Sequence, residues 1–210
     1  QHIALDENSQ LGGHDPYSSS KSATEIAVAS WRRSFFDSYD ASIVTARAGN
    51  VIGGGDWAID RIIPDIVRSF HHQDALRVRN PASVRPWQHV LEPLFGYMKL
   101  AEFSHKNRSL TSTDGVNFGP SSDVVASVSN LINKSAEVWG APIKIQMEDN
   151  ARYEAKYLML ESSKAKRLLD WHQKWDFETT VHNTIDWYKK FLAGACASSL
   201  MQEQINEYAG

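Results

Sequence analysis

"ASIVTARAGNVIGGGDWAIDRIIPD", residues 41–65, combines three kinds of local structure in one short segment. Residues 41–51 are rich in β-branched and small side chains, a composition that is typical of a buried strand. Three consecutive glycines at residues 53–55 then interrupt the strand pattern. Pro64 suits the first turn of a following helix, where its missing N–H costs no hydrogen bond. A strand, a glycine-rich loop and a helix in this order indicate an α/β protein.

The segments on both sides continue this alternation. Asp15 is a good N-cap and Pro16 suits the first helical position, so we expect a helix over residues 15–39. Further helices are expected from about Pro93, over residues 121–140, from Ser162 or Ser163, and from about Glu178. Strands are expected at residues 115–119, 143–147 and 157–160. The sequence therefore predicts an α/β fold with a mostly parallel sheet.

Bulk composition narrows the class of protein. The 210 residues are 42% hydrophobic and 22% charged, which is enough for the core of one domain or somewhat more. The formal net charge is −3 and the basic residues are scattered, so we expect no nucleic-acid partner. The single cysteine, Cys196, forbids an internal disulfide, and we expect it to be a small buried residue. No membrane-length apolar run and no leader is visible, so we expect a cytoplasmic protein without a membrane span.

The glycine-rich loop and the preceding Asn50 have two interpretations. Neither G-x-G-x-x-G at the start of a helix nor G-x-x-x-x-G-K-[ST] occurs, so we interpret the glycines as a tight irregular loop. Loops at the carboxyl ends of parallel strands bind ligands in open α/β sheets, which would place Asn50 at a binding site. On residue type alone, an ordinary loop position explains Asn50 equally well.

The stretch "HDPYSSSKSATE", residues 14–25, places a tyrosine and a lysine four positions apart near the start of a helix. Residues at that spacing share a face, so Tyr17 and Lys21 can converge on one point. A nearby ammonium and the positive end of a helix favour a phenolate over a phenol. A phenolate could take a sugar hydroxyl proton while a nicotinamide accepts a hydride. The alternative, an exposed tyrosine and lysine, is the commoner explanation of a bare Y-x-x-x-K.

Arg85 is the third candidate, within "RNPASVRPWQHVLEP" at residues 79–93. It precedes a proline, which disfavours helix, and its planar guanidinium can bind a diphosphate through charge-assisted hydrogen bonds. A solvated surface arginine is the commoner alternative. We expect the neighbouring Trp87 to be a core residue.

The histidines give no metal site. His71 and His72 with Asp74 lack further partners at metal-ligand spacing, and the others considered stand alone in the sequence: His14, His89 and His172. We expect solvated or hydrogen-bonded structural histidines.

Several blocks occur in one order: "LGGHDPYSSSK" (11–21), "ARAGNVIGGGDWA" (46–58), "VRPWQHVLEPLFGYMKLAE" (84–102), "NFGP" (117–120) and "YLMLESSKAKRLLDW" (157–171). In this order they resemble the extended short-chain dehydrogenase/reductase family of sugar-nucleotide enzymes, over nearly the whole chain. The blocks "AGNVIGGGDW" and "RPWQHVLEP" resemble the subfamily of CDP-glucose 4,6-dehydratases in particular.

The resemblance implies the C-terminal part of an NAD(P)-binding, Rossmann-like doubly wound sheet plus a smaller α/β substrate domain. It implies NAD as cofactor and CDP-glucose as substrate, converted to a 4-keto-6-deoxy sugar and water by an internal hydride cycle. Residues 1–53 and 85–118 would be the remnant of the nucleotide-binding domain, and residues 54–84 and 119–210 the substrate domain. The helix that carries Tyr17 and Lys21 would pair with its twin in a homodimer.

Roles transfer to five matching positions. Tyr17 corresponds to the catalytic base for the C4 hydroxyl, and Lys21 to the lysine that binds the nicotinamide ribose and favours the phenolate. Asn50 corresponds to a substrate contact near the diphosphate, Arg61 to the segment that lines the nucleotide, and Arg85 to an arginine that grips the diphosphate.

Some expected features have no counterpart in the sequence. The family's glycine-rich fingerprint lies well before its catalytic tyrosine, so we expect an N-terminal portion to be missing and the 210 residues alone to turn over little. The Thr/Ser-Asp-Lys/Glu stretch for water loss is also unmatched, and Tyr153 stands where histidine is expected. Two rival hypotheses remain: another epimerase or reductase of the same fold, and a non-catalytic binding or dimerisation module.

Overall fold

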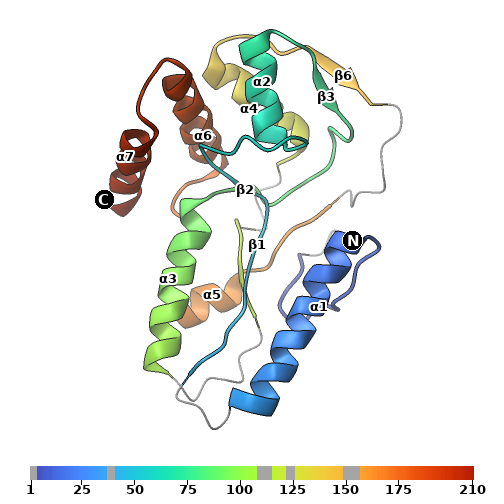
Figure 1. Cartoon of the computed structure of the whole chain (residues 1–210), viewed down its shortest axis with the longest axis vertical. Helices are drawn as coiled ribbons and strands as arrows, with labels where there is room; N and C mark the ends of the chain where they lie inside the picture. The colour runs from blue at the N-terminus through green and yellow to red at the C-terminus, as the bar shows by residue number, and fades with distance from the viewer. Residues whose placement is uncertain (1–3, 37–40, 108–114, 122–125, 149–156) are drawn as a thin grey trace.

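The computed structural model describes residues 4–36, 41–107, 115–121, 126–148 and 157–210. Helices and short strands alternate along these segments (Figure 1). The elements in chain order are α1 (Pro16–Trp31), the π-helical turn η1 (Arg32–Phe36), β1 (Ala46–Ala48), β2 (Val51–Ile52), α2 (Ile62–His72), β3 (Leu76–Val78), β4 (Gln88–His89), α3 (Leu91–Lys106), β5 (Val116–Phe118), α4 (Val128–Trp139), β6 (Ile145–Met147), α5 (Ser163–Leu169), α6 (Phe177–Leu192) and α7 (Ala197–Ala209).

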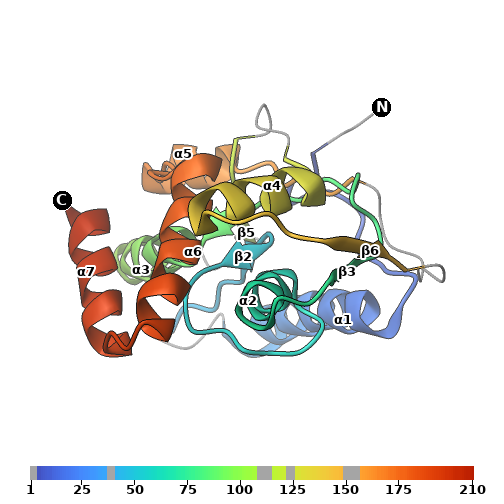
Figure 2. The ribbon, with the colours of Figure 1, turned by 90° about the horizontal axis from the view of Figure 1, so that it is seen from above.

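The described strands form three parallel pairs. β1 pairs with β5, β2 with β4, and β3 with β6, with Ala46 opposite Val116, Val51 opposite Gln88 and Leu76 opposite Ile145. Each pair joins strands that are separated by at least one helix, as parallel crossovers require. Figure 2 shows α4 and α5 on one side of the strands and α1 and α2 on the other. The predicted α/β fold with parallel strands is confirmed.

Helix ends follow the capping residues. The Asp15 carboxylate accepts hydrogen bonds from the backbone N–H groups of Tyr17 and Ser18, which starts α1 at Pro16 as predicted. Ser127 and Asn130 form a capping box, so α4 starts at Val128 rather than at residue 121. Residues 122–125 of the predicted helix lie outside the described residues. Of the strand expected at residues 157–160, the described residues form only isolated bridges at Tyr157 and Leu160.

Two hydrophobic clusters hold the elements together. The larger one joins α2, α4 and α6 through fully buried side chains such as Ile66, Leu131 and Ile185, and it includes Trp87, which confirms that residue as core. The smaller one centres on Phe118 of β5, whose ring meets Trp171 edge-on at 5.3 Å. Burial of these side chains is the main stabilising contribution to the fold.

The C-terminal helix α7 was not predicted, and its N-cap corrects one expectation. Cys196 is exposed, not buried, and its sulfur lies 3.2 Å from Ser198 Oγ. The residue caps a surface helix instead of filling the core, because the apolar face of α7 is formed by other side chains, Leu200 and Tyr208. Within the described segments, no helix has the length and apolar character needed to span a membrane.

The helix α1 differs from the other long helices because none of its sixteen residues is buried. Three of its apolar side chains are well exposed: Tyr17, Ile26 and Trp31. The ring of Phe35 in η1 lies 5.3 Å from that of Trp31, tilted by 59°. The division into two domains expected from the resemblance stays a prediction.

Candidate functional site

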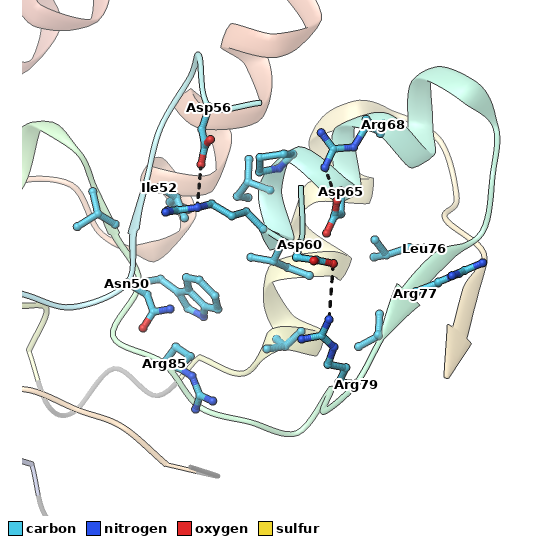
Figure 3. A pocket seen from close by; sticks show the side chains of 18 of the residues that line it. Asn50, Ile52, Asp56, Asp60, Asp65, Arg68, Leu76, Arg77, Arg79 and Arg85 are labelled. Atoms are coloured by element: carbon cyan, nitrogen blue, oxygen red, sulfur yellow. Dashed lines mark hydrogen bonds and ion pairs between the residues drawn. The ribbon is translucent and has the colours of Figure 1, made fainter. Parts of the chain in front are cut away.

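A cavity of about 1170 Å³ opens between the loops that follow β1 and β2, the helix α2, the strand β3 and the segment before β4 (Figure 3). Sites for small organic ligands usually measure roughly 300–1,000 Å³, so this one has room for a ligand as large as a nucleotide sugar. Its charged lining is evenly mixed, with the arginines 61, 68, 77, 79 and 85 and the acidic residues Asp56, Asp60, Asp65, Asp74 and Glu148.

Asn50 reaches the cavity from the loop after β1. A side chain at Gly49 would place its Cβ 2.5 Å from Pro86 Cγ, so only glycine lets this loop approach the segment 85–86 so closely. The Asn50 carbonyl accepts a hydrogen bond of 3.0 Å from the Gln88 backbone N–H. These contacts bring Asn50 and Arg85 to the same end of the cavity, as Figure 3 shows. The prediction that Asn50 lies in a loop after a parallel strand is confirmed.

The glycine-rich loop packs on a tryptophan. A Cβ on Gly54 would lie 2.1 Å from Cδ2 of Trp187, and Gly55 has a φ of +89°, in the region that favours glycine. The loop is therefore tight because it turns sharply against the Trp187 ring. This agrees with the prediction of an irregular loop.

Arg85 is the most enclosed arginine of the site. Only 6% of its surface is exposed, and its guanidinium donates a hydrogen bond of 2.8 Å to the Val84 carbonyl. It lines both the large cavity and a second one of about 140 Å³. Burial excludes the alternative of a solvated surface arginine. A buried, oriented guanidinium suits the binding of a phosphate or carboxylate.

Three of the other arginines in the lining pair with carboxylates. Arg61 Nε lies 3.8 Å from Asp56, and Arg68 pairs with Asp65. Arg79 bridges Asp60 and Glu148 at 3.6 and 2.9 Å, which connects the loop before α2 to the end of β6. Figure 3 shows the Arg68–Asp65 pair above the Arg79–Asp60 pair.

Arg77 and Arg79 were not singled out from the sequence. The only signal is the alternation of apolar and basic residues in "LRVRN" at residues 76–80. Leu76 and Val78 are buried, and residues 76–79 all contribute to the cavity lining.

Tyr17 and Lys21 lie as the helical spacing predicts. The Lys21 ammonium is 5.7 Å from the centroid of the Tyr17 ring, one turn further along α1. Tyr17 is 73% exposed and lines the large cavity. The structure thus brings Tyr17, Asn50, Arg61 and Arg85 to one cavity, with Lys21 beside the tyrosine but not in the lining. The roles of these five residues stay predictions.

A buried polar cluster lies next to β4, and the cavity lining does not include it. His89 is 1% exposed, and burial lowers its pKa to about 4. Its Nδ1 accepts a hydrogen bond of 3.3 Å from the Leu91 backbone N–H, which makes it a structural histidine as predicted. Among the residues that the structure describes, no group of three His, Cys, Asp or Glu side chains is placed to hold a metal ion.

Glu92 is the acceptor at the centre of this cluster. Its fully buried carboxyl accepts hydrogen bonds from the Trp175 and Lys174 backbone N–H groups and from the Tyr208 hydroxyl. Burial raises the pKa of Glu92, and these three donors oppose the rise. The cluster joins the start of α3 to the end of α7, and no local sequence pattern indicates this pairing.

Relatives of known name match most of the chain. The CDP-glucose 4,6-dehydratase of Salmonella typhimurium is 39% identical over 208 residues, which are 96% of this chain and 58% of that relative. A trifunctional UDP-glucose 4,6-dehydratase, 3,5-epimerase and reductase of Arabidopsis thaliana is 26% identical, over 87% of this chain and 26% of its own length. The chain therefore spans little more than half of the curated bacterial relative.

Solved structures share the fold. The UDP-glucuronic acid 4-epimerase of Bacillus cereus, solved with UDP-glucuronic acid and NAD, superposes with a TM-score of 0.76 at 17% identity, over 91% of this chain and 58% of its own. The dTDP-glucose 4,6-dehydratase of Bacillus anthracis, solved with NAD, gives a TM-score of 0.71 at 18% identity, over 91% and 58%. The model of one sequence family, GDP-mannose 4,6 dehydratase, matches residues 1–184. Since that match covers most of the 210 residues, the chain belongs to the GDP-mannose 4,6 dehydratase family.

Proposed function

We propose that the chain is part of an NAD-dependent CDP-glucose 4,6-dehydratase, a hydro-lyase that converts CDP-glucose to CDP-4-keto-6-deoxyglucose and water. The observation that carries the proposal is the meeting of Tyr17, Asn50, Arg61 and Arg85 around one cavity of about 1170 Å³. The 39% identity to the Salmonella enzyme of that name supports this choice of nucleotide and reaction.

The polar residues of the cavity suit the diphosphate of such a substrate. Arg85 offers an enclosed guanidinium, which binds phosphate oxygens through two parallel N–H groups. Arg61, whose side chain is 68% exposed, can leave Asp56 at small cost, because an exposed ion pair at 3.8 Å contributes little. The Asn50 amide, at the same end as Arg85, can donate to a phosphate or sugar oxygen.

Tyr17 suits the proton transfer at the sugar. Its exposed hydroxyl can accept the C4 hydroxyl proton as a phenolate, and the Lys21 ammonium offsets that negative charge. The same two residues fit the nicotinamide ribose of NAD, since an ammonium and a phenol one helical turn apart can both hydrogen-bond its hydroxyls. The chemistry that bound NAD supplies is removal of a hydride from C4 and its return to C6.

The test uses the complete protein with CDP-glucose and NAD, and mass spectrometry of the nucleotide sugar. We expect a product lighter by one water, with UDP-glucose and GDP-mannose as poorer substrates. Tyr17→Phe should lower kcat about 10²–10⁴-fold and leave KM nearly unchanged, since the hydroxyl acts in the transition state. Tyr97→Phe, on α3 outside the cavity lining, is the matched control. A product of unchanged mass would indicate an epimerase instead, and unchanged kcat would remove Tyr17 from the mechanism.

We also propose that α1 pairs with α1 of a second copy, in a cytoplasmic homodimer. The exposed Ile26 and Trp31 on a helix without buried residues support the pairing. The single cysteine fits a reducing compartment. Sedimentation velocity would test the dimer, and Trp31→Glu should shift the protein to monomer if α1 is the interface.

A further inference from the structure

The helix that carries Tyr17 and Lys21 is tied to the sheet by one carboxylate. Glu25 Oε2 accepts hydrogen bonds of 2.8 Å from Arg47 NH2 and of 2.8 Å from Thr45 Oγ1. The side chains of Glu25 and Arg47 are only 18% and 23% exposed. Since no residue of α1 is buried, this polar contact takes the place that an apolar face has in other helices.

The two donors are held by the paired strands β1 and β5. Arg47 is the central residue of β1 and lies opposite Asn117, and the Thr45 carbonyl accepts a hydrogen bond of 2.9 Å from the Val116 backbone N–H. A Cβ on Gly115 would lie 2.7 Å from Thr45 Oγ1 and 2.9 Å from Arg47 Nε. Glycine at that position therefore leaves the space in which both side chains turn toward Glu25.

The carboxylate is suited to stay charged in this place. Burial raises the pKa of Glu25, but the hydrogen bonds from Arg47 and Thr45 and the positive charge of Arg47 outweigh it, so the net pKa lies below its ordinary value. A charged carboxylate that accepts two hydrogen bonds in a largely covered place holds its partners more firmly than an exposed surface ion pair does.

Helix geometry connects this link to the candidate catalytic pair. Tyr17, Lys21 and Glu25 follow one another at four-residue spacing, so they lie along one side of α1. Glu25 is about 12 Å from Tyr17 along the helix axis. If α1 rolled by about 10°, a side-chain atom roughly 6 Å from the axis would move about 1 Å. A misplacement of that size can lower a catalytic rate about 10²-fold.

We propose that Glu25 and Arg47 are positioning residues, which fix the roll of α1 on β1 and thereby hold Tyr17 and Lys21 at the cavity. The proposal rests on the proposed function for its effect on catalysis, but the fixing of α1 does not depend on it. Neither residue lines the cavity, so substrate affinity is not their task.

The first measurement is kinetic. In the complete protein, Glu25→Gln keeps the shape of the side chain and removes the charge, and we expect kcat to fall about 10- to 100-fold with KM for CDP-glucose nearly unchanged. Arg47→Lys retains a cation, so its kcat should fall less than the kcat of Arg47→Met. The matched control is Glu102→Gln on α3, which makes the same substitution at the exposed Glu102–Lys106 ion pair. It should leave kcat unchanged. The proposal would be overturned if Glu25→Gln had the wild-type kcat. It would also be overturned if the variant raised KM and left kcat unchanged.

The second measurement needs no activity. Hydrogen–deuterium exchange followed by mass spectrometry should show faster exchange of the α1 amides in Glu25→Gln, but not in Glu102→Gln. If wild-type protein makes no dehydrated product and α1 exchange still rises, the proposed function fails and the positioning role stands. Unchanged exchange of α1 overturns the positioning role. Should Glu25→Gln not fold, Thr45→Val removes one of the two hydrogen bonds at nearly constant shape and is subjected to the same two measurements.

Discussion

Acid should destabilise the protein through His89, and the size of the effect follows from its burial. Burial holds the pKa of this imidazole at about 4, against an ordinary value of about 6.5 in the unfolded chain. Between these two values the unfolded chain binds a proton that the folded protein does not, so the free energy of unfolding falls as the pH falls from about 6.5 to about 4. The contribution is complete above pH 6.5.

A shift of about 2.5 pKa units corresponds to about 3.4 kcal/mol, at 1.36 kcal/mol per unit. About 2.5 kcal/mol of this lies between pH 7 and pH 4.5. The 1% exposure of His89 leaves little solvent to screen the charge. Protonation of Nδ1 would also remove the acceptor of the Leu91 N–H hydrogen bond. Burial and the hydrogen bond from Leu91 therefore both disfavour protonation of His89 in the folded protein.

The assay is urea unfolding at pH 7 and at pH 4.5, for the wild type and for His89→Asn. Asparagine retains an acceptor near the position of Nδ1 and cannot become charged. We expect the wild type to lose about 2.5 kcal/mol more than the variant between these two pH values, a difference of about 1 M in the urea midpoint. His182→Asn, at an exposed histidine, is the control. The raised pKa of Glu92 favours the folded state as the pH falls, which is opposite to the effect of His89. Both proteins contain Glu92, so its contribution cancels when the variant is compared with the wild type.

NMR gives an independent check, since the His89 ring resonance should titrate with a midpoint near pH 4. A midpoint near 6.5, or equal pH dependence of the two proteins, would refute the reasoning. Either result would mean that the ring is hydrated or has an acceptor for its second N–H in solution.

Two further changes test local packing and chemistry. Gly54→Ala should destabilise the protein by about 1–3 kcal/mol in urea unfolding, because its Cβ would lie 2.1 Å from the Trp187 ring, while Gly12→Ala, whose Cβ meets nothing within 4 Å, should be neutral. Cys196 should react with iodoacetamide with a midpoint near pH 7, because its hydrogen bond with Ser198 lowers the thiol pKa to about 7. Ser198→Ala should raise that midpoint, and a midpoint near 8.5 in the wild type would contradict the assignment.

The local part of the fold was predictable from the sequence. Asp15 and Pro16 mark the start of α1 because capping depends on neighbouring residues only. The strand that ends before Asn50 follows from β propensity, and the position of the next loop at the cavity follows from the rule for parallel sheets. Trp87 was predicted as core from its size and apolar character alone.

What could not be predicted depends on contacts between distant residues. Glu92 meets Tyr208 across 116 positions of sequence, and no local pattern pairs a buried carboxyl with a particular hydroxyl. Arg79 reaches Glu148 across 69 positions, and the alternation in residues 76–80 does not indicate which distant carboxylate pairs with it. Cys196 was predicted as buried because cysteines usually are, and the capping position that exposes it depends on how α7 docks.

Because no residue of α1 is buried, Tyr17 and Lys21 lie on a helix that should open locally more often than the helices of the core. A helix of sixteen residues that covers no core is marginal by itself, so its local opening should cost far less free energy than opening of α4 or α6. A second copy that covers Ile26 and Trp31 would stabilise the closed helix by mass action. Occupancy of the active conformation would then increase with protein concentration, so that specific activity at high dilution reports on the dimer as much as on the chemistry.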